Sequence, residues 1–225
     1  MSLGGIKQQF SLRENILMAM ESAEFYRNTR EAFKILDEIP PDIKYHPQGY
    51  LTLANEEQAD QLIDDHKTQI DSGAFVDILP PFKIKEKFPW LNINDIVLAT
   101  YGVQNEGLID PYHLLLGFKL KAEWLGARYL QAEIIGFNRK TWLNSGHYDE
   151  TGGFLQNVNH VIVREPDGVV KQIEFGVGIV ACGAASGQIA KMAGIGIPKS
   201  GLRSIPCPVE PRYSCDKRDV IIKYI

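Results

Sequence analysis

The feature that most constrains the fold lies near the C-terminal end, where an apolar run leads directly into five small residues. Residues 177–182, Val-Gly-Ile-Val-Ala-Cys, have the composition of a buried strand. Residues 183–187, Gly-Ala-Ala-Ser-Gly, then lead into a helical pattern over residues 188–194. A strand, a turn of small residues and a helix N-terminus make a site where backbone amides can approach a phosphate or a dinucleotide. Close packing of the strand against the helix also needs small residues, and it stays open as the alternative.

Composition excludes several classes of protein. A chain of 225 residues with 44% hydrophobic content is long enough for one large domain or two small ones. The formal net charge of -4 and the pI near 5.8 provide no attraction to nucleic acid or to an anionic membrane, so we expect no nucleic-acid partner. No apolar run approaches the eighteen residues of a transmembrane helix. The first residues resemble neither a signal peptide nor a transit segment, so we expect no targeting segment in this chain.

The cysteines and histidines do not predict a metal site. Three cysteines, Cys182, Cys207 and Cys215, are odd in number and lack the Cys-x-x-Cys spacing, which argues against a disulfide framework and favours a reducing compartment. A helix N-terminus could activate Cys182 as a nucleophile. Because no adjacent histidine supplies a base, we expect a buried packing cysteine instead. None of the five histidines has metal-ligand spacing: His46, His66, His113, His147 and His160.

The first half of the chain alternates helix and strand. Ser11 and Glu14 have the spacing of a capping box, which predicts a long helix that ends before Pro40-Pro41. A short strand is expected at residues 50–53, and Asn55 with Gln58 forms a second capping signature before a helix that ends near Gly73. Residues 76–79 favour a strand and residues 82–88 a short helix.

The second half is more regular. Asp110 before Pro111 is a good helix N-cap, and Gly126 is suited to the end of the same helix. A strand follows at residues 127–137. Pro166-Asp167-Gly168 predicts a tight turn, so residues 154–165 and 169–175 should form a hairpin. This order predicts a mixed α/β (α+β) fold with a small antiparallel insert.

Four segments carry a resemblance to a known family. They are residues 4–11 (GGIKQQFS), 88–92 (FPWLN), 101–111 (YGVQNEGLIDP) and 208–212 (PVEPR). Their order and spacing resemble the D-amino-acid oxidase and sarcosine oxidase superfamily of FAD-dependent oxidoreductases. The resemblance implies a Rossmann-type FAD domain interleaved with an antiparallel-sheet substrate domain.

On that template, residues 1–105 are mainly the substrate domain, with a flavin-edge segment at residues 4–11. Residues 106–200 are a partial FAD-binding domain with a hairpin insert, and residues 201–225 return toward the substrate domain with an atypical tail. The family's first glycine-rich unit would precede Gly4, and its flavin-closing segment would follow Arg212. We therefore expect a truncated middle portion, with weak or absent FAD binding and no catalytic competence alone.

The resemblance also implies site residues. The flavin ring would lie beside Gly4, Gly5, Gln8 and Gln9, unless this terminus is a disordered stub. The adenine edge would lie along the backbone of Ala132, Glu133 and Ile134, for which an ordinary core strand is the alternative. The FAD ribose and pyrophosphate would contact Ala181, Cys182, Gly183, Ala184 and Gln188. Arg212 would bind a substrate carboxylate, although an ion pair with Glu210 explains it equally well.

The implied activity is oxidation of a small amine or amino acid, with FAD as the hydride acceptor. Within the superfamily the likeness is closest to a mitochondrial branch associated with assembly of respiratory complex I. A mitochondrial location and complex I assembly intermediates as partners are implied by that likeness. Two alternatives stay open: a noncatalytic protein-binding assembly module, and an unstable truncated product.

Overall fold

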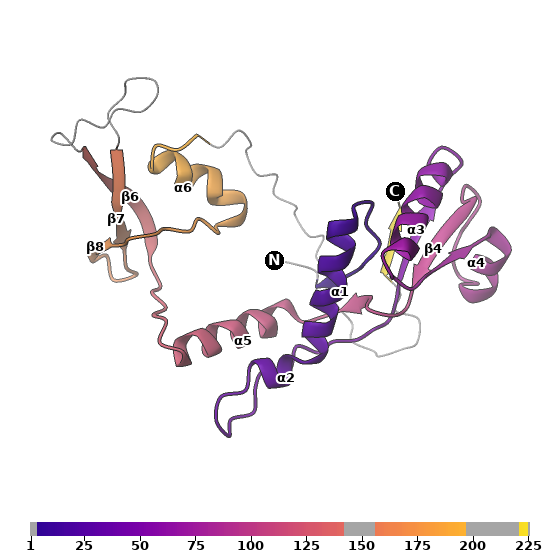
Figure 1. Ribbon diagram of the computed structural model, residues 1–225, viewed down its shortest axis with the longest axis horizontal. Helices are drawn as coiled ribbons and strands as arrows, with labels where there is room; N and C mark the ends of the chain where they lie inside the picture. The colour runs from indigo at the N-terminus through magenta and orange to yellow at the C-terminus, as the bar shows by residue number, and fades with distance from the viewer. Residues whose placement is uncertain (1–3, 142–155, 197–220, 225) are drawn as a thin grey trace. The chain divides into compact units, whose positions relative to one another are not determined.

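The computed structural model describes residues 4–141, 156–196 and 221–224, and divides the chain into two compact units (Figure 1). Unit 1 contains residues 1–128 and 206–225, and unit 2 contains residues 129–205. Each unit combines helices with antiparallel strands, which confirms the predicted mixed α/β class. The assignment of residues 1–105, 106–200 and 201–225 to the domains of a flavoprotein stays a prediction.

Unit 1 is built on a four-stranded sheet with the order β3-β4-β2-β9. The strands are β2 (Tyr50–Ala54), β3 (Val76–Leu79), β4 (Leu98–Gly102) and β9 (Ile221–Tyr224); β9 runs parallel to β2 and the other pairs are antiparallel. Alternate residues of β2 and β4 pack with Ile84 and Phe88, at α4 (Pro81–Lys87), in the largest apolar core. Thr52 and Thr100 pair across β2 and β4 between these core positions, so they point to the opposite face of the sheet.

The helices of this unit test the predicted caps. Asn55 and Gln58 form the expected reciprocal pair, at 3.1 and 3.4 Å, just before α3 (Ala59–Asp71). The capping box at Ser11 is wrong, because the Ser11 hydroxyl donates instead to the Asp65 carboxylate at 3.0 Å. The first helix, α1 (Arg13–Arg27), also ends earlier than expected. A turn at Asn28 leads into the short α2 (Thr29–Ala32).

A short ribbon connects the sheet to the next helix. Strand β1 (Gly5–Ile6) pairs antiparallel with β5 (Gly107–Leu108), and α5 (Pro111–Trp124) follows. The predicted N-cap is confirmed, because the Asp110 carboxylate accepts hydrogen bonds from the amides of Tyr112 and His113 at 2.9 and 3.2 Å. Gly126 follows α5 with a φ of 98°, as expected for glycine after a helix end.

Unit 2 is a three-stranded antiparallel sheet with one short helix packed on β6. Its strands are β6 (Glu133–Thr141), β7 (Gln156–Arg164) and β8 (Val170–Glu174), and the helix is α6 (Ser186–Met192). The predicted hairpin is confirmed, since the Gly168 amide donates to the Glu165 carbonyl at 2.9 Å and closes the turn between β7 and β8.

Residues 177–182 do not form the predicted strand. They lie in an irregular segment in which Val177 is 86% and Ile179 is 89% exposed. An apolar, β-prone run becomes a strand only when a neighbouring strand supplies hydrogen-bond partners. No strand pairs with this run in the described part of the chain. Cys182 is exposed as well, so the expectation of a buried packing cysteine is wrong.

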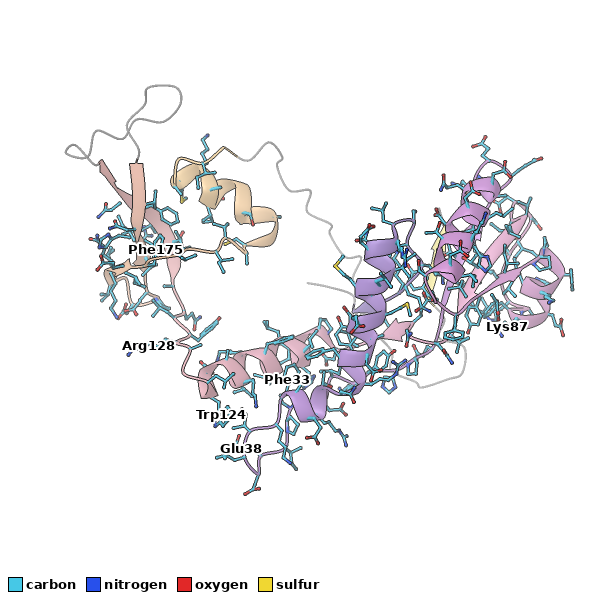
Figure 2. All side chains as sticks on the ribbon, in the orientation of Figure 1. Phe33, Glu38, Lys87, Trp124, Arg128 and Phe175 are labelled. Atoms are coloured by element: carbon cyan, nitrogen blue, oxygen red, sulfur yellow. The ribbon has the colours of Figure 1, made fainter. Side chains whose placement is uncertain are left out.

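The contact between Gly117 and Phe33 generates a prediction about stability. A Cβ atom on Gly117, in the middle of α5, would overlap the buried ring of Phe33, which Figure 2 labels. Gly117→Ala should therefore lower the unfolding free energy by about 1–2 kcal/mol, although alanine favours a helix. Urea denaturation measures this change. The double variant Phe33→Leu with Gly117→Ala should recover part of the loss, and a more stable single variant would contradict the packing argument.

Candidate functional site

A buried carboxyl group lies where the N-terminal segment, residues 4–9, meets the sheet of unit 1. Glu106 precedes β5 and its side chain is fully buried. One carboxylate oxygen accepts the backbone N–H of Gln8 at 2.8 Å, and the other accepts the side-chain amide of Gln9 at 2.7 Å. The backbone of Gln9 also hydrogen-bonds to this carboxylate. The carboxylate thus joins two parts of the chain that are nearly one hundred residues apart in sequence.

Gln9 joins the Glu106 carboxylate to strands β2 and β4 through its side-chain amide. Its side-chain nitrogen also donates to the Tyr50 carbonyl at 2.9 Å. Its side-chain oxygen accepts the hydroxyls of Thr52 at 2.9 Å and Thr100 at 2.7 Å, the pair that faces away from the apolar core. Both ends of the Gln9 amide are therefore bonded within the protein.

Gln8 is held in a similar way at the other side of Glu106. Its side-chain nitrogen donates to the Gln104 carbonyl at 2.9 Å, and its oxygen accepts the Asn105 amide at 3.3 Å. Arg27 in turn donates to the Asn105 side chain. The N-terminal segment is thus ordered rather than a disordered stub, and the amides of Gln8 and Gln9 face the protein. Their assignment to the flavin edge, with that of Gly4 and Gly5, stays a prediction.

Glycines allow the close contacts around this carboxyl group. A Cβ atom on Gly102 would overlap a carboxylate oxygen of Glu106, and one on Gly107 would overlap the His46 carbonyl. Gly4 has a φ of 73°, and a Cβ atom there would overlap the Ile109 carbonyl. These three glycines are required by the packing of the protein itself.

Burial changes the acidity of Glu106. Desolvation raises its pKa from 4.5 to about 7, and it outweighs the hydrogen bonds from Gln8 and Gln9 and the charge of Lys7, which lower it. Burial raises the pKa of Tyr50 and Tyr101 as well, and the Glu106 charge adds to that effect. Glu106 can therefore take up or release a proton near neutral pH.

Sequence reasoning did not single out Glu106. An acidic residue between Asn105 and Gly107 reads as part of a solvated turn, and its hydrogen-bond partners are distant in sequence. The one local signal is Gly102, and it becomes informative only when the fold shows that a Cβ atom there would overlap the Glu106 carboxylate.

The remaining candidates that the structure describes lie in unit 2. On β6, the Glu133 carboxylate lies 3.6 Å from Arg164 in an exposed ion pair, and Ile134 pairs with Val163 of β7. The turn candidates Ala181, Cys182, Gly183, Ala184 and Gln188 are all exposed. Among the described residues, none lies within 4 Å of a Cβ atom placed on Gly183. Close packing of a strand against the helix therefore does not explain Gly183, whose φ of 54° is one that glycine favours.

Four residues considered from the sequence lie outside the described residues: Cys207, Glu210, Arg212 and Cys215. Within the described ranges, no group of three or more histidine, cysteine or acidic side chains is placed to hold a metal ion. The helices described there are also too short or too polar to cross a membrane.

An open hollow of about 430 Å³ lies beside β3 and β4. Its lining includes Phe75, Tyr101 and Gln104.

Comparison with known proteins identifies the family. The sequence profile described as FAD dependent oxidoreductase matches residues 2–218. The chain belongs to this family. The chain is 39% identical over 215 residues to FAD-dependent oxidoreductase domain-containing protein 1 of Xenopus laevis, which confirms the resemblance inferred from sequence. The match covers 94% of the chain and 43% of that relative, so the chain spans less than half the relative's length.

Solved structures share the fold of this FAD-dependent oxidoreductase chain. L-proline dehydrogenase from P. horikoshii superposes with a TM-score of 0.63 at 24% identity, over 85% of the chain and 44% of that structure. Glycine oxidase from Geobacillus kaustophilus gives 0.60 at 18% identity, over 86% and 47%. At these identities the likeness shows the fold alone.

The raised pKa of Glu106 predicts how stability depends on pH. The proton binds more tightly in the folded state, with a pKa of about 7, than in the unfolded state, near 4.5. The stability contributed by this group is therefore fully present below pH 4.5, decreases as the pH rises, and is lost above about pH 7. The shift corresponds to roughly 3 kcal/mol.

Urea denaturation between pH 4.5 and 8 measures this dependence. Glu106→Gln should flatten the pH profile by roughly 3 kcal/mol relative to the unchanged protein. The control is Glu86→Gln, an exposed carboxylate at which we expect no change of profile. Identical slopes for Glu106→Gln and the unchanged protein would contradict the assignment.

Proposed function

We propose that this chain is part of an FAD-dependent oxidoreductase that oxidises a carbon–nitrogen bond of a small amine or amino acid. Family membership supports the cofactor class. The names of L-proline dehydrogenase and glycine oxidase, which share the fold, support an amino-acid-like substrate. The observation that carries the proposal is the exposed turn at Gly183–Ala185, where no described residue packs against the Cβ position of Gly183.

The residues of this turn would fit a cofactor phosphate. Backbone amides can approach a diphosphate only where side chains do not intervene, and no residue that the structure describes occupies the Cβ position of Gly183. The backbone of Ala181, Cys182 and Ala184 would line the same approach. Along β6, the backbone of Glu133 and Ile134 would face the adenine.

In unit 1, the proposal assigns the flavin edge to residues 4–9. Gly5 is exposed and lets the backbone approach a planar ring, while Gln8 and Gln9 hold the segment to the sheet through their bonded amides. When bound, FAD would accept a hydride from the carbon beside the substrate nitrogen. The chain's own residues would orient the substrate and exclude water, and Arg212 would bind its carboxylate.

The first prediction of this proposal concerns FAD retention. The 225-residue chain spans 43% of its Xenopus laevis relative, so we expect weak or absent FAD binding by the chain alone. The measurement is the flavin absorbance spectrum before and after addition of FAD and passage through a desalting column. Stoichiometric flavin after desalting would overturn this expectation and would make a screen of amines and amino acids worthwhile.

We also propose a mitochondrial location and association with complex I assembly intermediates. The support is the resemblance of the sequence to the branch with that role, and the surface of α5, where Tyr112 and Leu115 are each about two-thirds exposed. Large apolar side chains exposed on one helix favour a contact with another protein. The second candidate function is a noncatalytic assembly module, which would bind its protein partner through the same surface of α5.

A pair of variants separates the two candidate functions. Ala184→Val places a branched side chain where the cofactor phosphate would approach, at a residue whose φ lies outside the left-handed region. Leu115→Glu places a charge on the exposed face of α5. Affinity purification from mitochondria, followed by mass spectrometry, measures the associated complex I subunits. If the chain acts as an assembly module, Ala184→Val keeps the association and Leu115→Glu loses it. Loss with Ala184→Val alone would favour a role that depends on flavin.

A further inference from the structure

Glu106 has a geometry that neither the family profile nor the sequence motifs assign to it. Its partners at hydrogen-bond distance, the amides of Gln8 and Gln9, are all donors. An ionised carboxylate accepts hydrogen bonds and donates none, so this environment suits the charged form in shape. The same environment excludes water, which disfavours the charge. The hydrogen bonds therefore favour the ionised form of Glu106, while its burial favours the protonated form.

The other charged or titratable groups near Glu106 lie on the N-terminal segment, on α1, on β2, on β4 and at Tyr45. Lys7 belongs to the same segment, and its ammonium lies 4.8 Å from the Phe10 ring centroid and 5.7 Å from that of Tyr50. Tyr50 of β2, Tyr101 of β4 and Tyr45 all interact electrostatically with the carboxylate. The pKa of Tyr45 is raised by burial and by Glu106, while Arg27 lowers it. Burial raises the pKa of each of these tyrosines above its ordinary value, so none of them carries a charge at physiological pH.

We propose that Glu106 is the positioning residue that fixes residues 4–9 against the sheet, and that its proton controls how readily this segment opens. The description of this segment as the flavin edge rests on the proposed function above, whereas the anchoring rests on the geometry alone. Detaching the segment removes the three hydrogen bonds from Gln8 and Gln9 and admits water to the carboxyl group.

The direction of the pH effect follows from linkage. Water lowers the pKa of Glu106 toward its ordinary value of 4.5, whereas in the closed segment the pKa is about 7. The closed segment therefore binds the proton more tightly than the open one, so raising the pH from 4.5 to 7 favours opening. Above pH 7 both states are ionised and the dependence ends. The shift of pKa corresponds to a change in the opening equilibrium on the order of a hundredfold.

Hydrogen exchange on the 225-residue chain tests this role at the segment itself. Exchange is followed by mass spectrometry from pH 4.5 to 8, and rates are corrected for the intrinsic effect of pH on exchange. In the unchanged protein, protection of the peptide that contains Gln8 and Gln9 should fall on the order of a hundredfold by pH 7.5. Peptides from β7, which belongs to unit 2, should change much less. An equal loss across all peptides would overturn the proposal, because Glu106 would then act on global stability alone.

Two variants separate the carboxyl group from packing. Glu106→Gln should abolish the pH dependence of protection at residues 4–9, because its amide does not titrate. Thr100→Val removes one hydroxyl that donates to Gln9 but leaves Glu106 in place. It should lower protection at every pH and keep the pH dependence. If Glu106→Gln does not fold, the unchanged protein and Thr100→Val still decide the outcome, since a pH-independent segment in both would refute the role of Glu106.

A flavin measurement keeps this proposal separate from the proposed function. FAD is added at each pH, and quenching of its fluorescence reports binding. Where binding occurs, it should weaken as the pH rises toward 7 in the unchanged protein and not in Glu106→Gln. Absence of binding at every pH would count against FAD binding by this chain, while the exchange result would still decide the anchoring role of Glu106.

Discussion

The burial of one carboxyl group is the constraint on which much of unit 1 depends. Moving an ionisable group out of water is costly unless hydrogen bonds replace its hydration. Glu106 obtains those bonds from a segment that precedes it by almost one hundred residues, so the chain must return to the same place. Three features keep the N-terminal segment at the buried carboxylate. The pairing of β1 with β5 brings the two parts of the chain together, and Gly102 leaves room for the Glu106 side chain. The hydroxyls of Thr52 and Thr100 hold the Gln9 amide in place.

This arrangement gives the N-terminal segment a rigidity that its length alone would not provide. A chain end normally frays, because ordering its backbone costs conformational entropy. Here Gln9 makes hydrogen bonds to Glu106, β2 and β4, and Gln8 is bonded at both ends of its amide. A segment held in this way can present backbone to a ligand without a further ordering cost. The rigidity also makes a single carboxyl group able to control the whole segment.

Local signals predicted the elements whose cause is local. Asp110 caps α5 because both of its amide partners lie within three residues, and the turn at Gly168 needs only its own glycine and its neighbours. The signal failed at Ser11, where the hydroxyl had a distant competitor in Asp65. It failed also at residues 177–182, where β propensity was present but no paired strand is described. Glu106 was missed for the same reason, since its partners are brought together only by the fold.

Two glycines, Gly4 and Gly183, differ in how well they indicate a cofactor site. Sequence reasoning treated Gly4 and Gly183 alike, as positions where backbone could approach a cofactor. The structure separates them, because a side chain at Gly4 would overlap the Ile109 carbonyl, whereas a Cβ atom at Gly183 would contact none of the residues described. Gly4 is therefore already explained by internal packing, and its presence does not by itself indicate a ligand. At Gly183 the φ of 54° favours glycine, but the neighbouring alanines are also small and exposed. The exposed turn of unit 2 thus carries more of the argument for a cofactor than the glycines of unit 1, whose role is to let a buried carboxyl group hold its segment.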